Sequence, residues 1–441
     1  MQGCIRVKGG NKLIGEVVPI ANKNAILAAL PACLLTDKDV TYHNVPQTSD
    51  VKKILSVLQK LGAKVDSTNF NKIVINCSQV NSYAIDLELG KSIRSSILFA
   101  GPLLARFGKA IVPLPGGCLL GKRSIAAHID VFKKAGISCS INDLQETAEF
   151  FVESKLVNTA LDIWMSEASV TATENIAMYA AGTSTPMTIR DAACEPHVVQ
   201  LLELLKDTGA KISGIGSNVL HIEGSKGLAG FSFTPWPDHI DIAGYIAAVA
   251  MCGGKIVIKN ANLPQVMNGI LDWFKLFGVD VYPQGANLVA EGTKLPQIDY
   301  ANLSFPLAGD HLPKFIPRPW PGFPVDLLPI MITLACKNKG SIMMQNWMYE
   351  SGLDFTRELN KLGADILTCD PQRVIVNGRI NFKGGELVSP NVIQACMALF
   401  LAGMADPVET VLHGVQSLNR RYANIFESYR HLGADIEVLE D

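Results

Sequence analysis

Leu61-Gly62-Ala63-Lys64-Val65 ends a helix-like stretch and opens a strand-like one, and similar phrases occur five more times along the chain. The glycines of these phrases are 74, 73, 69, 85 and 70 residues apart. This spacing is too long for the unit of a helical solenoid and too regular for chance. The sequence therefore predicts one supersecondary unit used six times. The phrases are centred on Gly62, Gly136, Gly209, Gly278, Gly363 and Gly433.

Each predicted unit begins with a helix that is apolar on all sides, which is typical of a buried helix. A β-rich run follows, such as Met187–Arg190 or Glu409–His413. An amphipathic helix such as 50–61 or 198–208 then ends at the glycine, where a left-handed cap needs no Cβ. The buried helices are expected at 24–30, 94–105, 170–181, 240–251, 325–335 and 392–404.

Buried helices with sheets and amphipathic helices outside them predict an inside-out α/β barrel, in which three units form one domain and six form two. The boundary is expected at the Pro- and Trp-containing stretch 233–238. The first domain then covers 21–234, and the second covers 1–20 plus 235–441. We expect the segment from Arg6 to Pro19 to pair with the second domain, because it precedes the first repeat helix.

The composition excludes several classes of protein. The formal net charge of −2 gives no basic field for nucleic acid. The chain is 48% hydrophobic and 18% charged, yet its longest apolar runs, such as 397–404, are much shorter than a membrane span. The N-terminus has no secretion-signal pattern, and the ten cysteines form no C-x-x-C pair, which favours free thiols in a reducing compartment. We therefore expect a cytoplasmic protein without contacts to membrane or nucleic acid.

Unusual polar residues gather at the starts of the predicted buried helices. Helix N-termini offer free N–H groups and favour anions. Ordinary N-capping could explain Ser169, Asn24 and Asp326. Capping does not explain Lys23 and Arg94, because a cation at the positive end of a helix is unfavourable unless an anion joins it.

A second concentration of chemistry is the glycine-rich loop 114–123, which holds Cys118 between two glycines and the cations Lys122 and Arg123. Nearby cations lower the pKa of a thiol and make it more reactive. A flexible surface loop with an incidental cysteine is the alternative.

These two features, with their order in the chain, resemble the enolpyruvyl transferases, in particular those acting on UDP-N-acetylglucosamine. The enzymes acting on shikimate 3-phosphate are more distant siblings. The resemblance covers essentially the whole chain. Its most specific segments are Ala21-Asn22-Lys23-Asn24-Ala25, Arg94–Ile97 with Gly101–Gly108, Leu114–Cys118, Glu195-Pro196, Phe323–Asp326 and Arg420–Tyr422.

The resemblance implies transfer of the enolpyruvyl group of phosphoenolpyruvate to a hydroxyl of UDP-N-acetylglucosamine, with release of phosphate, in a cleft between the two domains. This reaction is the first committed step of peptidoglycan synthesis. Both substrates are small molecules, and neither a cofactor nor a metal is implied.

Roles for individual residues are also implied by the resemblance. Asp326 is expected to take the proton of the attacking hydroxyl, and Cys118 to protonate the vinyl carbon or aid product release. The phosphate is expected to be neutralised by three cations, since a departing phosphate needs charge stabilisation. These cations are Lys23, Arg123 and Arg420, and further substrate contacts are expected from Asn24, Arg94, Ser169 and Val170.

Several positions depart from the family pattern. Gly352 and Gln394 stand where two arginines are expected to bind the carboxylate of phosphoenolpyruvate, and Val392 or Asn391 replaces an aspartate. Glu167 stands where a lysine near the diphosphate is expected, and Thr171 replaces a glycine close to the uridine. Arg318 and Arg357 are candidates to compensate.

These departures leave two alternatives open. One is an enolpyruvyl transferase with a different nucleotide or sugar acceptor. The other is a catalytically silent paralogue that binds a nucleotide sugar or a partner protein.

Overall fold

The six glycine phrases have the same backbone conformation in the computed structural model, which describes residues 3–114, 125–153, 160–292, 297–299, 312–349 and 351–439. All six glycines have φ between +75° and +115° at the end of a helix. This is the left-handed region that residues with a Cβ rarely adopt. The predicted unit and its sixfold repetition are confirmed.

The helices of the repeats are of two kinds. One helix of each repeat is buried almost all round, whereas the other has a buried and an exposed face. The buried helices are α1 (Lys23–Ala32), α4 (Ala100–Phe107), α6 (Val170–Ala181), α8 (His239–Cys252), α10 (Leu328–Lys337) and α12 (Ile393–Ala405). The outer helices are α2 (Ser49–Leu61), α5 (Ala126–Lys134), α7 (Pro196–Asp207), α9 (Pro264–Leu276), α11 (Thr356–Lys361) and α13 (Ile425–His431), with the short α3 (Leu87–Lys91) in addition.

The described strands form six sheets with one common order. An edge strand runs parallel to its neighbour, and the next two pairs are antiparallel. The three-stranded sheet follows the same order, because a parallel bridge from Ala84 to Ile111 takes the place of its edge strand. One half of the chain contributes β13 (Ser232–Phe233), β3 (Val40–His43), β5 (Lys72–Asn76) and β4 (Lys64–Asp66); β6 (Lys109–Pro113), β8 (Thr147–Val152) and β7 (Ile137–Asn142); and β9 (Leu161–Trp164), β10 (Met187–Arg190), β12 (Val219–Glu223) and β11 (Lys211–Ser213).

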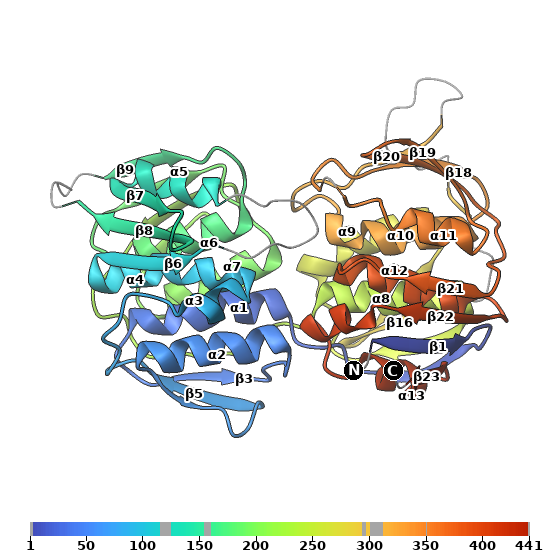
Figure 1. Cartoon of the computed structure of the whole chain (residues 1–441), viewed down its shortest axis with the longest axis horizontal. Coiled ribbons are helices and arrows are strands. Elements are labelled where there is room, and N and C mark those ends of the chain that lie inside the picture. Colours follow the sequence, from blue (N-terminus) through green and yellow to red (C-terminus); the bar gives the residue numbers. More distant parts are fainter. Residues whose placement is uncertain are drawn as a thin grey trace. The chain divides into compact units, whose positions relative to one another are not determined.

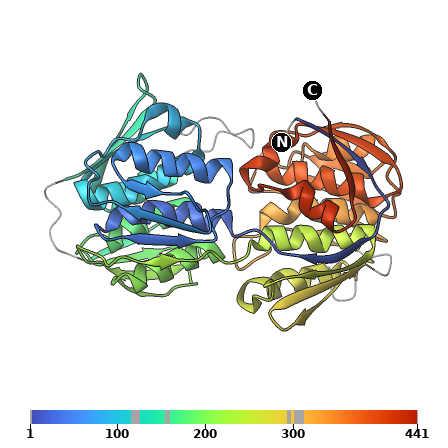
Figure 2. The same cartoon turned by 90° about the horizontal axis from the view of Figure 1, so that it is seen from below.

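The N-terminal segment completes two sheets of the other half. Strand β1 (Cys4–Lys8) lies antiparallel between β22 (Glu409–His413) and β23 (Asp435–Leu439), with Ile5 opposite Leu412 on one side and Val438 on the other. Figure 2 shows this dark-blue strand beside the red C-terminal strands. The remaining strands of this half are β21 (Gly385–Val388); β2 (Leu13–Val17), β14 (Gly254–Ile258), β16 (Asn287–Gly292) and β15 (Asp280–Gln284); and β17 (Lys314–Phe315), β18 (Ser341–Gln345), β20 (Arg373–Asn377) and β19 (Asp365–Asp370).

The chain divides into two compact units, and each has its own interior. Of the described residues, those between Ala21 and Trp236 form one unit, and those up to Ile20 form the other together with those from Pro237 onward. In the second unit α8, α10 and α12 contact one another, and sheets flank them (Figure 1). In the first unit α6 contacts both α1 and α4. This is the inside-out α/β architecture expected from the sequence.

Short 3₁₀ turns lead into or out of several buried helices. They are η1 (Cys33–Leu35), η2 (Arg94–Phe99), η3 (Val325–Leu327) and η4 (Val415–Arg420). Two of the predicted helix starts, at Arg94 and Val325, therefore lie in 3₁₀ turns that precede the α-helix. No helix of the described ranges is long and apolar enough to cross a membrane.

Gly278→Ala is expected to destabilise the protein more than Gly363→Ala in the same unit. Both glycines have positive φ, +75° and +87°, so both alanines incur backbone strain of about 1–3 kcal/mol. A Cβ on Gly278 would in addition lie 2.7 Å from the backbone nitrogen of Gln297, whereas one on Gly363 would meet only the flexible Lys383 side chain at 3.5 Å. The measurement is the urea midpoint of each variant; equal midpoints would mean that the backbone at Gln297 yields without cost.

Candidate active site

Lys23 is the first residue of α1, and its charge is balanced within the protein. Its Nζ lies 3.1 Å from Oδ2 of Asp50 in the first turn of α2, and both side chains are about nine-tenths buried. An anion was required to make a cation tolerable at this helix end, and Asp50 supplies it. Asp50 was not identified from the sequence. The sequence indicated only that Lys23 needs an anion nearby.

N-capping explains only one of the three polar residues for which the sequence allowed it. Ser169 does cap α6, since its side chain accepts a hydrogen bond from the Ala172 backbone N–H. The cap of α1 is Asn22 and not Asn24, which lies half-buried in the first helical turn. Asp326 lies within η3 and makes no capping hydrogen bond. Capping therefore explains Ser169 and leaves Asn24 and Asp326 available for another task.

A buried hydrogen-bonded chain holds the beginning of α6. The Asn175 amide accepts from Gly101 N at 2.6 Å and donates to Ile97 O at 2.7 Å, which fixes its orientation. Its Nδ2 also donates to Nδ1 of His128 at 3.0 Å, so His128 Nε2 carries the proton and donates to Thr171 Oγ1 at 3.0 Å. Both ring nitrogens of His128 are thus hydrogen-bonded within the protein, which gives this histidine a structural role.

Near the start of α6, the His128 ring is neutral, whereas Arg94 and Glu167 carry charges. Burial, and secondarily the charge of Arg94, lower the pKa of His128 to about 3, so its ring is neutral under ordinary conditions. Arg94, the first residue of η2, is half-buried, and so are Val170 and Thr171. Glu167 is exposed, so its carboxylate is solvated.

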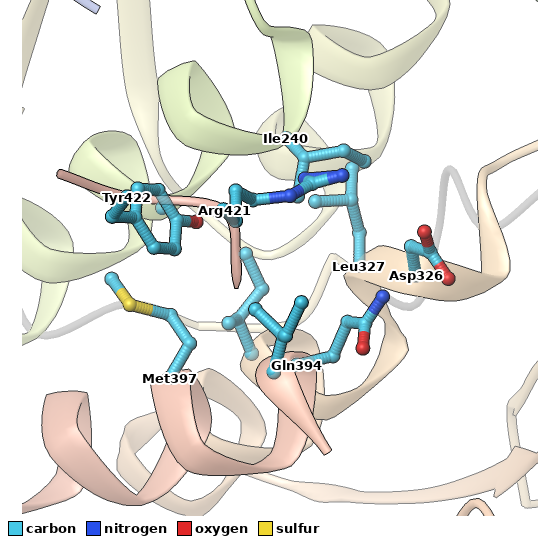
Figure 3. Close-up of a pocket in the computed structure, with 10 residues that line it drawn as sticks. Ile240, Asp326, Leu327, Gln394, Met397, Arg421 and Tyr422 are labelled. Atoms are coloured by element: carbon cyan, nitrogen blue, oxygen red, sulfur yellow. The ribbon is translucent and has the colours of Figure 1, made fainter. Parts of the chain in front are cut away.

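In the other unit, Asp326 and Gln394 line two adjoining depressions. The first is small and is also lined by Arg421, Tyr422 and Leu327 (Figure 3). The second is also small and is lined in addition by Gly352 and Asn346. Asp326 and Gln394 are both half-buried. Asp326 lies just before α10, and Gln394 lies in the first turn of α12. The arrangement places a potential base beside two small pockets.

The local packing leaves no room for a side chain at position 352. A Cβ on Gly352 would lie 2.0 Å from Nδ2 of Asn346, which is buried and whose Oδ1 accepts from Tyr349 N at 3.1 Å. Any side chain at 352 would displace this asparagine. The two suggested replacements, Arg318 and Arg357, are exposed and line neither depression.

Arg421 is a cation beside the first depression that sequence reasoning did not single out. It follows η4 and is 3% exposed, and its Nη1 lies 3.5 Å from Oδ2 of Asp238. The neighbouring Arg420, the last residue of η4, is half-buried. The sequence shows both arginines in the Arg420-Arg421-Tyr422 stretch, but it does not indicate that Arg421 is the buried one.

Asp241 is a buried carboxyl next to this arginine. Burial is the main cause that raises the pKa of Asp241 to about 8; the Ile20 N–H that its Oδ2 accepts at 2.9 Å opposes this rise, and the Asp238 carboxylate adds to it. Asp241 is therefore mostly protonated at neutral pH.

Asp241→Asn is expected to flatten the pH dependence of stability. The folded carboxyl binds its proton more tightly than an unfolded aspartate with a pKa of 3.8, so its contribution favours folding at low pH and is lost as the pH rises from about 4 to about 8. An asparagine keeps an oxygen for Ile20 N and never ionises. Urea midpoints at pH 5 and pH 8 should fall more for the wild type than for the variant; parallel falls would show that Asp241 does not titrate in this interval.

Two predicted site residues, Cys118 and Arg123, lie outside the described residues. Among the residues that are described, no group of three or more His, Cys, Asp or Glu side chains could hold a metal ion.

Comparisons with known proteins agree with the fold. The family model described as EPSP synthase (3-phosphoshikimate 1-carboxyvinyltransferase) matches residues 7–439. Among solved structures, the enolpyruvyl transferase NikO from Streptomyces tendae has a TM-score of 0.84 at 20% identity and 99% coverage of both chains. The EPSP synthase of Acinetobacter baumannii has a TM-score of 0.74 at 15% identity, with 100% of both chains covered. The family model defines the class, and the two solved structures show the same fold.

Curated relatives are more similar in sequence. The UDP-N-acetylglucosamine 1-carboxyvinyltransferase of Borreliella burgdorferi is 36% identical over 98% of both chains. The protein of the same name from Treponema denticola is 34% identical over 98% of this chain and 99% of its own. The chain belongs to the enolpyruvyl transferase family.

Proposed function

We propose that this protein transfers the enolpyruvyl group of phosphoenolpyruvate to a hydroxyl of UDP-N-acetylglucosamine and releases phosphate, the first committed step of peptidoglycan synthesis. The observation that carries the proposal is the similarity, over nearly the full length, to relatives named for this activity. The position of Asp326 beside two adjoining depressions supports it.

In the proposed reaction, Asp326 acts as general base. It takes the proton of the sugar hydroxyl as the hydroxyl oxygen attacks C2 of phosphoenolpyruvate, while C3 gains a proton. Loss of a proton from C3 and cleavage of the bond between C2 and the phosphate oxygen then restore the double bond. Cys118 is proposed to protonate C3 or to aid product release.

The phosphate is proposed to be bound by Lys23, Arg123 and Arg420. Cations fixed in place stabilise a leaving phosphate without reorganisation during the reaction. Asp50 holds the ammonium of Lys23 at 3.1 Å and so restricts it to one position. The acceptor is proposed to contact Asn24, Arg94, Ser169 and Val170. Lys23 and Arg94 belong to one unit, and Asp326 and Arg420 belong to the other.

A different nucleotide acceptor is the second candidate function. It is favoured by Thr171, whose side chain is held at the start of α6 by His128, and by the exposed carboxylate of Glu167. A carboxylate close to a diphosphate would weaken its binding by repulsion. An acceptor with fewer phosphates, such as UMP, would suffer less from it.

The deciding experiment is phosphate release by the purified protein with phosphoenolpyruvate and either UDP-N-acetylglucosamine or UMP, each substrate also being tested alone. Release that requires phosphoenolpyruvate and UDP-N-acetylglucosamine together supports the first function, and release that requires UMP instead supports the second. Thermal stabilisation by a nucleotide without any release would indicate a silent binding paralogue and contradict both.

A further inference from the structure

The Arg421 guanidinium is buried, charged and incompletely paired. Its Nε and Nη1 are shielded from solvent and have no hydrogen-bond acceptor, although the side chain is 97% buried. An arginine carries five N–H donors and stays protonated in proteins. Buried donors of a charged group are costly when they lack an acceptor, so the Nε and Nη1 donors of Arg421 are available to a further acceptor.

Asp238 balances the charge of Arg421 without satisfying its donors. Oδ1 of Asp238 accepts from Ile240 N at 2.9 Å and thereby caps α8, while Oδ2 lies 3.5 Å from Arg421 Nη1 without a hydrogen bond. Burial alone would lower the pKa of Arg421, but the negative charge of Asp238 raises it above its ordinary value. Asp238 therefore keeps the guanidinium charged and holds it from one side.

The guanidinium belongs to the depression that Asp326 and Gln394 line. Figure 3 shows the Arg421 side chain extending toward Leu327, with Asp326 beyond it and Gln394 on the facing helix α12. Among the described residues lining the two depressions, Arg421 is the one cation. Of the two positions where the family resemblance leads one to expect arginines, Gln394 lies in this depression, and Gly352 is closed to side chains by Asn346.

We propose that Arg421 binds the carboxylate of the three-carbon enolpyruvyl donor, replacing from the η4 segment the positive charge that positions 352 and 394 lack. This inference rests on the proposed function for the identity of the donor. A planar guanidinium matches the two oxygens of a carboxylate and can donate to both at once. The amide N–H groups of Gln394 supply further donors from the facing helix.

The test compares phosphoenolpyruvate with isopropenyl phosphate, which carries a methyl group in place of the carboxylate. Dissociation constants for both ligands are measured by titration calorimetry, so no turnover is needed. The wild type is expected to bind phosphoenolpyruvate about 10- to 100-fold more tightly, as expected for hydrogen bonds between charged groups. Arg421→Met should reduce this ratio to about twofold or less and leave the affinity for isopropenyl phosphate nearly unchanged.

Two further variants control for folding. Arg430→Met removes an arginine of α13 that binds Ile436 O and Glu427, away from the depression, and should leave the ratio as in the wild type. Gln394→Arg in the Arg421→Met background returns a cation to the same depression and should restore at least half of the lost discrimination on a logarithmic scale. A purely structural role of Arg421 would not be rescued in this way. Should Arg421→Met not fold, Gln394→Arg alone must increase the ratio.

The outcomes separate this inference from the proposed function. A wild-type ratio in Arg421→Met, or equal weakening of both ligands, overturns the role of Arg421 even if the enzyme is active. A wild type that binds the two ligands equally, or neither of them, overturns it as well. A ratio that depends on Arg421 upholds the inference, even if UDP-N-acetylglucosamine fails as acceptor.

Discussion

Asp326→Asn should lower phosphate release in the presence of both substrates by about 10²- to 10⁴-fold, the usual contribution of a general base. An amide has nearly the shape of a carboxylate but cannot accept the proton of the attacking hydroxyl. The side chain lies half-buried in η3 beside both depressions, where the loss of one proton acceptor has no nearby substitute on the same turn. Because the substitution removes a proton acceptor that is needed in the chemical step, kcat should fall much more than KM rises.

Asp272→Asn provides the matched control, since this aspartate is exposed on α9 in the same unit. It should leave kcat within about twofold, because exposed charges away from a site contribute little. Far-ultraviolet circular dichroism and the melting temperature should match the wild type for both variants. An Asp326→Asn protein with a wild-type kcat would show that another group takes the proton.

Asp406→Ala should destabilise the protein by about 3–5 kcal/mol, because it leaves a buried ammonium without its carboxylate. Lys337, the last residue of α10, donates to both oxygens of Asp406 at 2.8 Å and to Ile380 O at 2.8 Å. Asp406 Oδ2 also accepts from Phe382 N at 2.7 Å. Both side chains are close to nine-tenths buried, so water cannot replace the lost partner. The urea midpoint of the variant reports this loss.

The double variant Lys337→Met/Asp406→Leu separates charge burial from packing. Apolar side chains of similar size often replace a buried ion pair at little cost, so the double variant should recover most of the stability. Lys337 and Asp326 lie at opposite ends of α10, so the KM of the folded double variant for phosphoenolpyruvate should stay near that of the wild type. A single variant destabilised by less than about 1 kcal/mol would show that the ammonium gains access to water.

Periodicity and local backbone chemistry carried the prediction of the fold. The spacing of the six glycines and the uniformly apolar helices led to the inside-out α/β repeats, and strands such as Met187–Arg190 and Glu409–His413 were predicted to the residue. Such features are local, because a left-handed cap needs glycine and a helix buried on all sides needs apolar residues throughout. Helix starts were less accurate: the cap of α1 is Asn22 and not Asn24, and η2 and η3 begin as 3₁₀ turns.

Much of the candidate site was also accessible from the chain alone, since Lys23, Asn24, Arg94, Ser169, Asp326 and Arg420 occupy positions that a family resemblance assigns residue by residue. Their proposed roles await the experiments above. The resemblance also located the departures at Gly352 and Gln394. It could not say whether other residues compensate for them, because compensation depends on which side chains meet in space.

The features of the candidate site that the sequence did not predict depend on contacts between distant segments. Asp50 balances Lys23 across 27 residues, Asn346 closes the space at Gly352, and Asp238 holds Arg421 across nearly half of the chain. Each pairing joins elements whose sequences carry no common signal, so neither periodicity nor composition reveals it. The repeated fold follows from rules that act within a few residues, whereas the charge of the candidate site is set by burial and by partners that only the packing of remote helices brings together.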